Sequence, residues 1–210
     1  MTLIADVIAR WDSGEGKPYK GKLIDRAAYA ADPSDIGCMC AQGQVLHLVG
    51  GWSPERLWGA EQSEADKETA KLLNISIAHA ILLRSINDKV DGAPSIVLTH
   101  PEKVLGDQAH IVLAFWRHLD RMTGKDWLKV AAAGAAARAA AGAAAWAAAR
   151  AAARAAAWAA AWDAAWDAAY ACGEIQGAAL MRERGQPFFF LPMFGFADPE
   201  AVLAADQVSA

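Results

Sequence analysis

Residues 131–171 read AAAGAAARAAAGAAAWAAARAAARAAAWAAAWDAAWDAAYA, and this stretch decides the fold. Alanine has the highest intrinsic helix propensity of the amino acids, so the stretch predicts helix. With its flanks the predicted helix runs from Trp127 to Cys172, about 45 residues or roughly 65–70 Å at 1.5 Å per residue. Gly134 and Gly142 are the places where it could bend, because each glycine costs about 1 kcal/mol in a helix.

The repeat has a period of four, which does not match the 3.6 residues of a helical turn. The positions that interrupt the alanines are Gly134, Arg138, Gly142, Trp146, Arg150, Arg154, Trp158, Trp162, Trp166 and Tyr170. Each step of four advances about 400°, so this row drifts by roughly 40° per repeat and winds around the helix. One flat surface cannot cover such a row. We therefore expect several neighbouring helices, or a second subunit, to cover it.

The chain before the repeat predicts short helices separated by Gly and Pro. The expected helices cover residues 2–11, 23–31, 34–49, 54–57, 63–73, 75–86 and 107–122. Ser53, followed by Pro54, and a capping box over residues 63–66 mark two of the helix starts. We expect an extended loop at residues 95–100, and then a single helical turn that begins at Pro101.

Beyond Cys172 we expect the long helix to continue to Gly185. The next segment, QPFFFLPMFGF at residues 186–196, holds too much Pro and Gly for a helix. It predicts an extended apolar segment that packs against the long helix or a second subunit. Asp198 then caps a last short helix.

The predicted fold class is therefore all-α, with several short helices packed around one long alanine-rich helix and an extended aromatic C-terminal segment. The chain divides into an N-terminal multi-helix region at residues 1–124, the long helix at 125–184 and the C-terminal segment at 185–210. We expect these three parts to fold as one cooperative unit.

Composition limits the class of protein. The 210 residues include 20 basic and 24 acidic ones, a formal net charge of −4, which argues against duplex nucleic acid as a partner. Three cysteines, an odd number in a long chain, argue against a disulfide framework and indicate a reducing compartment. The N-terminus lacks a signal-peptide pattern, and charges interrupt the alanine tract, so no membrane helix is expected. We predict a cytoplasmic protein.

Cys38, Cys40 and His47 come nearest to a metal-binding group. Residues two apart on a helix point about 200° away from each other, so a Cys-x-Cys pair there chelates poorly. Buried structural cysteines are the simpler interpretation, and a Cys–His catalytic pair is another. We predict no metal and no cofactor. His79 is expected to be a hydrogen-bonded core histidine, and nothing marks His118 as a catalytic base.

Two arginines and three tryptophans of the repeat are the candidate ligand-binding or partner-binding residues: Arg150, Arg154, Trp158, Trp162 and Trp166. Arginine pairs with phosphate or carboxylate, and tryptophan stacks on a base or holds a cation. The simpler alternative is that the tryptophans fill a helix–helix interface while the arginines reach water. No nucleotide-binding, hydrolase or metalloprotease motif is present, so no catalytic residue is assigned and an enzyme is not expected.

The AAAR, AAAW and DAAW repeats at residues 131–171 resemble the alanine–tryptophan tetrad tracts of phage and bacterial proteins. Most of those proteins are uncharacterised, and some are labelled immunity proteins. The resemblance implies a phage or bacterial origin, a bacterial or phage-infected cell as the location, and a role in host–phage conflict. It brings no catalytic residues.

Three hypotheses about function follow. The first is a non-enzymatic helical protein that forms a homo-oligomer and binds another protein, because one chain would struggle to cover the long helix on all sides. The second is a protein that binds or sequesters a small anionic, nucleotide-like ligand through the arginines and tryptophans of the repeat. The third is an enzyme based on the N-terminal Cys and His residues.

Overall fold

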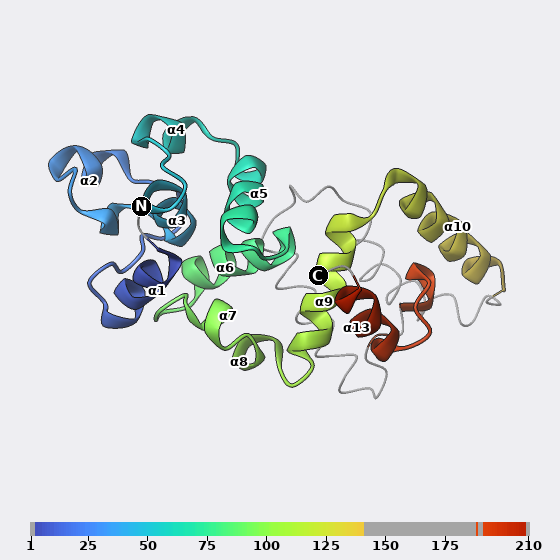
Figure 1. Cartoon of the computed structure of the whole chain (residues 1–210). Coiled ribbons are helices and arrows are strands. Elements are labelled where there is room, and N and C mark those ends of the chain that lie inside the picture. The colour runs from blue at the N-terminus through green and yellow to red at the C-terminus, as the bar shows by residue number, and fades with distance from the viewer. Residues whose placement is uncertain (1–2, 141–187, 189–190, 209–210) are drawn as a thin grey trace. The chain divides into compact units, whose positions relative to one another are not determined.

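The computed structural model describes residues 3–140, 188 and 191–208 (Figure 1). Within these ranges the chain is helical and has no strand, only an isolated antiparallel bridge between Ile24 and Met39. The all-α prediction is confirmed. The described residues separate into two units, one ending at Ala109 and the other beginning at His110, whereas the sequence-based division falls after residue 124.

The first unit is built from eight α-helices and one 3-10 helix within the described residues. They are α1 (Ile4–Ser13), α2 (Arg26–Ala31), η1 (Ile36–Cys38), α3 (Ala41–Leu48), α4 (Pro54–Gly59), α5 (Gln62–Leu73), α6 (Ile77–Lys89), α7 (Ile96–Thr99) and α8 (Glu102–Leu105). Helix α3 is central, because α1, α4, α5 and α6 all pack against it (Figure 1). Its first six residues are buried without a break.

Gly43 explains how α3 comes so close to the chain before it. A Cβ atom at this position would lie 2.0 Å from the carbonyl oxygen of Leu23. The neighbouring backbone N–H of Cys40 donates a 3.2 Å hydrogen bond to that same oxygen. Glycine is therefore the residue that allows the bridge segment to lie directly on the helix.

The helix predicted for residues 34–49 is divided in two, which corrects the sequence interpretation. Helix η1 ends at Cys38, Met39 is extended, and α3 starts after Cys40. The reason is pairing with the preceding segment, because the N–H of Asp25 donates to the carbonyl of Cys38 at 2.8 Å. Backbone groups used in this pairing cannot also serve a continuous helix.

The extended loop predicted for residues 95–100 is also wrong. Ile96–Thr99 forms the one-turn helix α7, and α8 follows Pro101 as predicted. Val97 is fully buried, and its carbonyl accepts a 2.8 Å hydrogen bond from Nε2 of the buried His79. The prediction that His79 is a hydrogen-bonded core residue is confirmed, and this contact holds the turn.

The N-cap residues test the predicted helix starts most directly. Ser53 accepts a hydrogen bond from the N–H of Arg56, and Asp198 accepts one from the N–H of Ala201, as predicted. The capping box at residues 63–66 is wrong, because the N-cap of α5 is Glu61, two residues before Ser63. The last residue of that supposed box, Asp66, is instead completely buried.

The second unit contains α9 (Ala109–Arg121), α10 (Gly124–Ala140), the 3-10 helix η2 (Leu191–Phe194) and α13 (Pro199–Gln207). Helix α10 covers the start of the predicted long helix and runs through Gly134. The predicted extended segment instead includes η2, which packs against α10. Phe194 meets Phe115 of α9 edge-on, with 5.0 Å between ring centroids.

The C-terminal segment contacts the start of α10. The rings of Trp127 and Phe194 lie 6.3 Å apart, centroid to centroid, and their planes are nearly perpendicular. The rest of the predicted long helix, from residue 141 to Gly185, lies outside the described residues.

Helix α13 is held to α9 by a carboxylate between two arginines. Both oxygens of Asp206 accept 3.0 Å hydrogen bonds from Nε of Arg117, and its Oδ1 also pairs with Arg121 at 3.3 Å. Among the described residues, no helix is long and apolar enough to cross a membrane.

Candidate functional site

The binding residues predicted from the repeat cannot be compared with the structure. Arg150, Arg154, Trp158, Trp162 and Trp166 all lie outside the described residues. Their assignment as a ligand-binding or partner-binding group therefore stays a prediction.

The Cys/His group is described, and its three members have separate structural roles. Cys38 ends η1, while Cys40 is the N-cap of α3, where its Sγ accepts a 3.4 Å hydrogen bond from the N–H of Gly43. Burial raises the pKa of Cys40 to about 12 and also raises the pKa of Cys38. Nδ1 of His47 donates to the carbonyl of Trp52 at 2.7 Å.

These environments disfavour thiolate chemistry. A nucleophilic or metal-ligating cysteine needs a lowered pKa, whereas both thiols here are buried and have raised pKa values. Over the described ranges, no group of three or more His, Cys, Asp or Glu side chains is arranged to hold a metal ion. The structure therefore does not bring the Cys/His residues together as a reactive centre.

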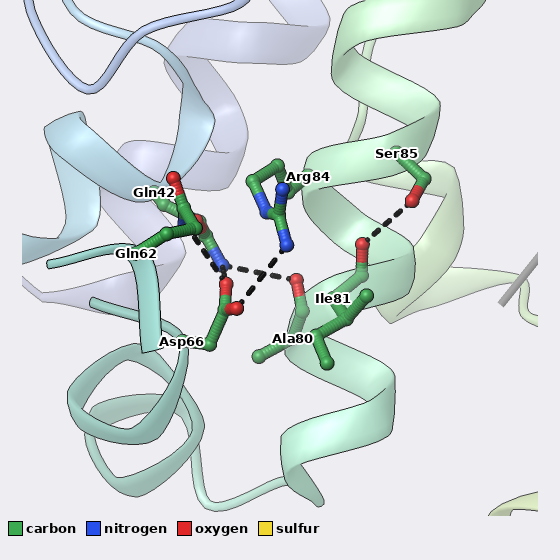
Figure 2. Close-up of polar contacts among 7 residues, drawn as sticks. All are labelled: Gln42, Gln62, Asp66, Ala80, Ile81, Arg84 and Ser85. Atoms are coloured by element: carbon green, nitrogen blue, oxygen red, sulfur yellow. Dashed lines mark hydrogen bonds and ion pairs between the residues drawn. The ribbon is translucent and has the colours of Figure 1, made fainter. Parts of the chain in front are cut away.

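A polar cluster lies in the interior of the first unit, on three helices (Figure 2). Oδ1 of Asp66 accepts hydrogen bonds from Nε2 of Gln42 at 2.8 Å and from Nε2 of Gln62 at 3.1 Å. Its other oxygen pairs with Arg84 at 3.2 Å. Gln42 also donates to the carbonyl of Ala80 at 3.1 Å. The cluster thus joins α3, α5 and α6.

The buried cluster is built to fix the helices and offers little chemistry. Both oxygens of Asp66 are occupied by donors, and no hydroxyl, thiol or imidazole takes part in the hydrogen bonds that form the cluster. A buried carboxylate is tolerated only when donors and an opposite charge surround it. Arg84 retains a buried Nε–H with no hydrogen-bond acceptor among the described residues.

A second glutamine, Gln44, also makes buried hydrogen bonds, on the other side of α3. Oε1 of Gln44 accepts the indole N–H of Trp11 at 2.9 Å, and its Nε2 donates to the carbonyls of Gly16, Ile36 and Met39 at 3.0–3.2 Å. Residues two apart on a helix point in nearly opposite directions, so Gln42 and Gln44 serve different neighbours.

Helix α10 presents an exposed face in the second unit. Val130 is 8% exposed, whereas Leu128 is 71% exposed. Ala131 and Ala132 are exposed as well. These three exposed residues, Leu128, Ala131 and Ala132, form what we call the α10 face. A large apolar side chain beside small ones is the composition of a helix-packing surface.

Sequence reasoning missed the buried cluster. Gln42 and Gln44 stand in the apolar run CMCAQGQVL, and polar residues inside such a run are the one signal that could have pointed to buried hydrogen bonds. Asp66 was assigned to a helix cap because local spacing allows it. Its partners Gln42 and Arg84 are 24 and 18 residues away, so no local pattern identifies them.

Compared with family models, with curated proteins and with solved structures, the chain has no match.

Proposed function

We propose that the protein acts without enzymatic chemistry, by self-association through α10 and the alanine-rich repeat that follows it. The observation that carries the proposal is the exposure of Leu128 on a helix whose neighbouring residue Val130 is buried. Within the described part of the chain, one side of α10 is covered and the α10 face is exposed.

Alanine makes this face suited to a second copy of the same helix. Helices whose contact surfaces carry small side chains approach each other closely, at the short end of the usual 8–10 Å between axes. The sequence continues the same small-residue pattern for a further 31 residues, to Ala171. Two identical helices related by a two-fold axis would bury the same face on both chains. Two-fold symmetry is the commonest symmetry of homo-oligomers.

A mass measurement tests the proposal. Light scattering over a range of protein concentrations should give a mass above that of the 22.2 kDa monomer, and Leu128→Glu should lower it. Val208→Glu is the matched control, because Val208 is an exposed apolar residue outside the α10 face and its substitution should leave the mass unchanged. A wild-type protein that is monomeric at every concentration would overturn the proposal.

The second candidate function is binding of a small anionic, nucleotide-like ligand by Arg150 and Arg154. The spacing of arginine and tryptophan in the sequence of the repeat supports it. A nucleotide that stabilises the protein against heat should lose this effect in Arg154→Ala, while the subunit mass stays unchanged.

The resemblance of the repeat to phage and bacterial tetrad tracts supports a setting in the cytoplasm of a bacterial or phage-infected cell, with a role in host–phage conflict.

A further inference from the structure

Two tryptophans of the first unit each have an arginine over the ring, and they differ in how firmly that arginine is held. The guanidinium carbon of Arg56 lies 3.7 Å from the ring centre of Trp52. Arg56 is also anchored by an ion pair with Glu64 at 2.9 Å, and Trp52 is only 3% exposed. We call this pair closed, because its arginine is held by an ion pair and its tryptophan is buried. It serves as the reference for the second pair.

The other pair is open. The guanidinium carbon of Arg26 lies 5.1 Å from the ring centre of Trp58, and within the described parts of the chain Arg26 has no carboxylate partner. Tyr29 of α2 meets Trp58 of α4 edge-on, with centroids 6.0 Å apart and planes at 79°. Both rings are only partly buried. Two nearly perpendicular aromatic rings form a corner in which a cation can contact a π-face.

Asp25, the residue before Arg26 in the chain, does not hold the guanidinium of Arg26. The Asp25 carboxylate is the N-cap of α2 and accepts hydrogen bonds from the N–H groups of Ala27 and Ala28, both at 2.9 Å. These hydrogen bonds, chiefly the one from Ala28, lower the pKa of the Asp25 carboxyl. Arg26 therefore lies over Trp58 without an ion pair to its neighbour in the chain.

No hydrogen bond fixes the ring of Trp58 in place. Its indole N–H is buried and has no acceptor among the described residues. By contrast, the indole N–H of Trp11 in the same unit donates to Gln44. The ring of Trp58 is therefore positioned by its packing against Tyr29 and Arg26 and not by a hydrogen bond.

We propose that the Trp58–Tyr29 corner binds an arginine side chain presented by a partner protein, and that Arg26 occupies the corner in the free chain. Guanidinium is the expected occupant because the corner already holds one, and because this planar, weakly hydrated cation stacks well on aromatic rings. The partner's arginine displaces Arg26, which no ion pair among the described residues retains. This site is independent of the α10 face.

The test uses the whole chain and a minimal probe, N-acetyl-arginine amide, with N-acetyl-citrulline amide as the uncharged control of the same shape. Indole N–H signals are followed by ¹⁵N NMR, and the signal of Trp58 is identified by its loss in Trp58→Phe. We expect a saturable shift of that signal with the arginine probe and none with the citrulline probe. Arg26→Ala should tighten binding by roughly two- to fivefold, the gain expected when a competing exposed cation–π contact is removed.

Matched variants keep the result interpretable. Arg56→Ala removes the arginine of the closed pair and should leave the affinity at Trp58 unchanged, while Tyr29→Leu removes one wall and should weaken it. The remaining indole signals report whether each variant is folded. Equal shifts with arginine and citrulline, a shift at Trp52 as large as at Trp58, or an affinity that Arg26→Ala leaves unchanged or weakens would each overturn the proposal.

Discussion

Asp66 of α5 and Arg84 of α6 form an ion pair at 3.2 Å in the interior of the first unit, where the carboxylate is 0% and the arginine side chain 12% exposed (Figure 2). The two glutamines that donate to the same carboxylate come from α3 and α5. Three helices therefore depend on one buried charge and its partners.

Removal of the arginine leaves that charge without a counter-ion. Arg84→Met keeps most of the apolar stem and should lower the free energy of unfolding by roughly 3 kcal/mol, the cost of an uncompensated buried charge. Chemical denaturation measures it. Lys67→Met, on the exposed side of the same helix α5, is the control and should change stability by less than about 0.5 kcal/mol. A similar small effect for Arg84→Met would mean that the two glutamines alone satisfy Asp66.

The two serines that precede apparent helix starts should behave differently. Ser53 accepts a hydrogen bond from the N–H of Arg56, so Ser53→Ala should cost about 1 kcal/mol. Ser63 lies inside α5, so Ser63→Ala should be neutral or slightly stabilising, because alanine is the better helix former. Thermal unfolding of both variants distinguishes the structure from the capping box suggested by spacing, which would make Ser63→Ala cost about as much as Ser53→Ala.

Gly43 and Gly59 form a second pair of contrasting positions. Gly43→Ala places a Cβ atom 2.0 Å from the carbonyl of Leu23, so α3 must shift, at a cost of about 2–3 kcal/mol or more. Gly59→Ala meets nothing within 4 Å and should stabilise by about 0.4–1 kcal/mol through the unfolded chain. Denaturant midpoints measure both effects. Equal midpoints would contradict the close approach of α3 to residue 23.

His118 makes the second unit sensitive to acid. Its ring lies 4.7 Å from that of Phe196, centroid to centroid, and burial, with a smaller contribution from Arg121, lowers its pKa. A lowered pKa in the folded state means that the unfolded chain binds the proton more tightly. The stabilising effect is therefore complete above the ordinary histidine pKa of about 6.5 and is lost as pH falls through the lower folded value.

The measurement compares the pH dependence of unfolding in the wild type and in His118→Gln between about pH 7.5 and 5. The wild type should lose more stability on acidification than the variant, which lacks this titrating group. His100→Gln is the control, because His100 is exposed and lies outside the second unit. Parallel curves for the wild type and His118→Gln would show that His118 does not carry the acid sensitivity.

Local signals predicted the elements well where the deciding interaction is itself local. Ser53 and Asp198 cap helices through hydrogen bonds to groups three residues away, so their neighbours in sequence suffice to identify them. Alanine propensity likewise predicted helix within α10, and the rest of the predicted long helix stays a prediction. The all-α fold class depends on such short-range interactions, and the described residues confirm it.

The departures occur where distant segments compete for the same groups. Pairing with residues 23–25 interrupts the helix predicted at residues 34–49, and the contact of Val97 with His79 gives a helical turn where a loop was expected. The position of Asp66 in the sequence suggests a capping residue, but its carboxylate is buried in the core. Gln62 is local, but Gln42 and Arg84 come from other helices, and no local pattern contains those two.

The sequence alone determined that this chain is helical, where several of its helices begin, and that an alanine-rich row with bulky residues every fourth position follows α10. Only the tertiary structure decided which polar side chains are buried, that Phe194 contacts Trp127, and which described residues of α10 are exposed. The physical reason is the sequence separation over which each interaction acts. Propensity and capping act within a turn of helix, whereas burial and the pairing of charges depend on residues brought together from far along the chain.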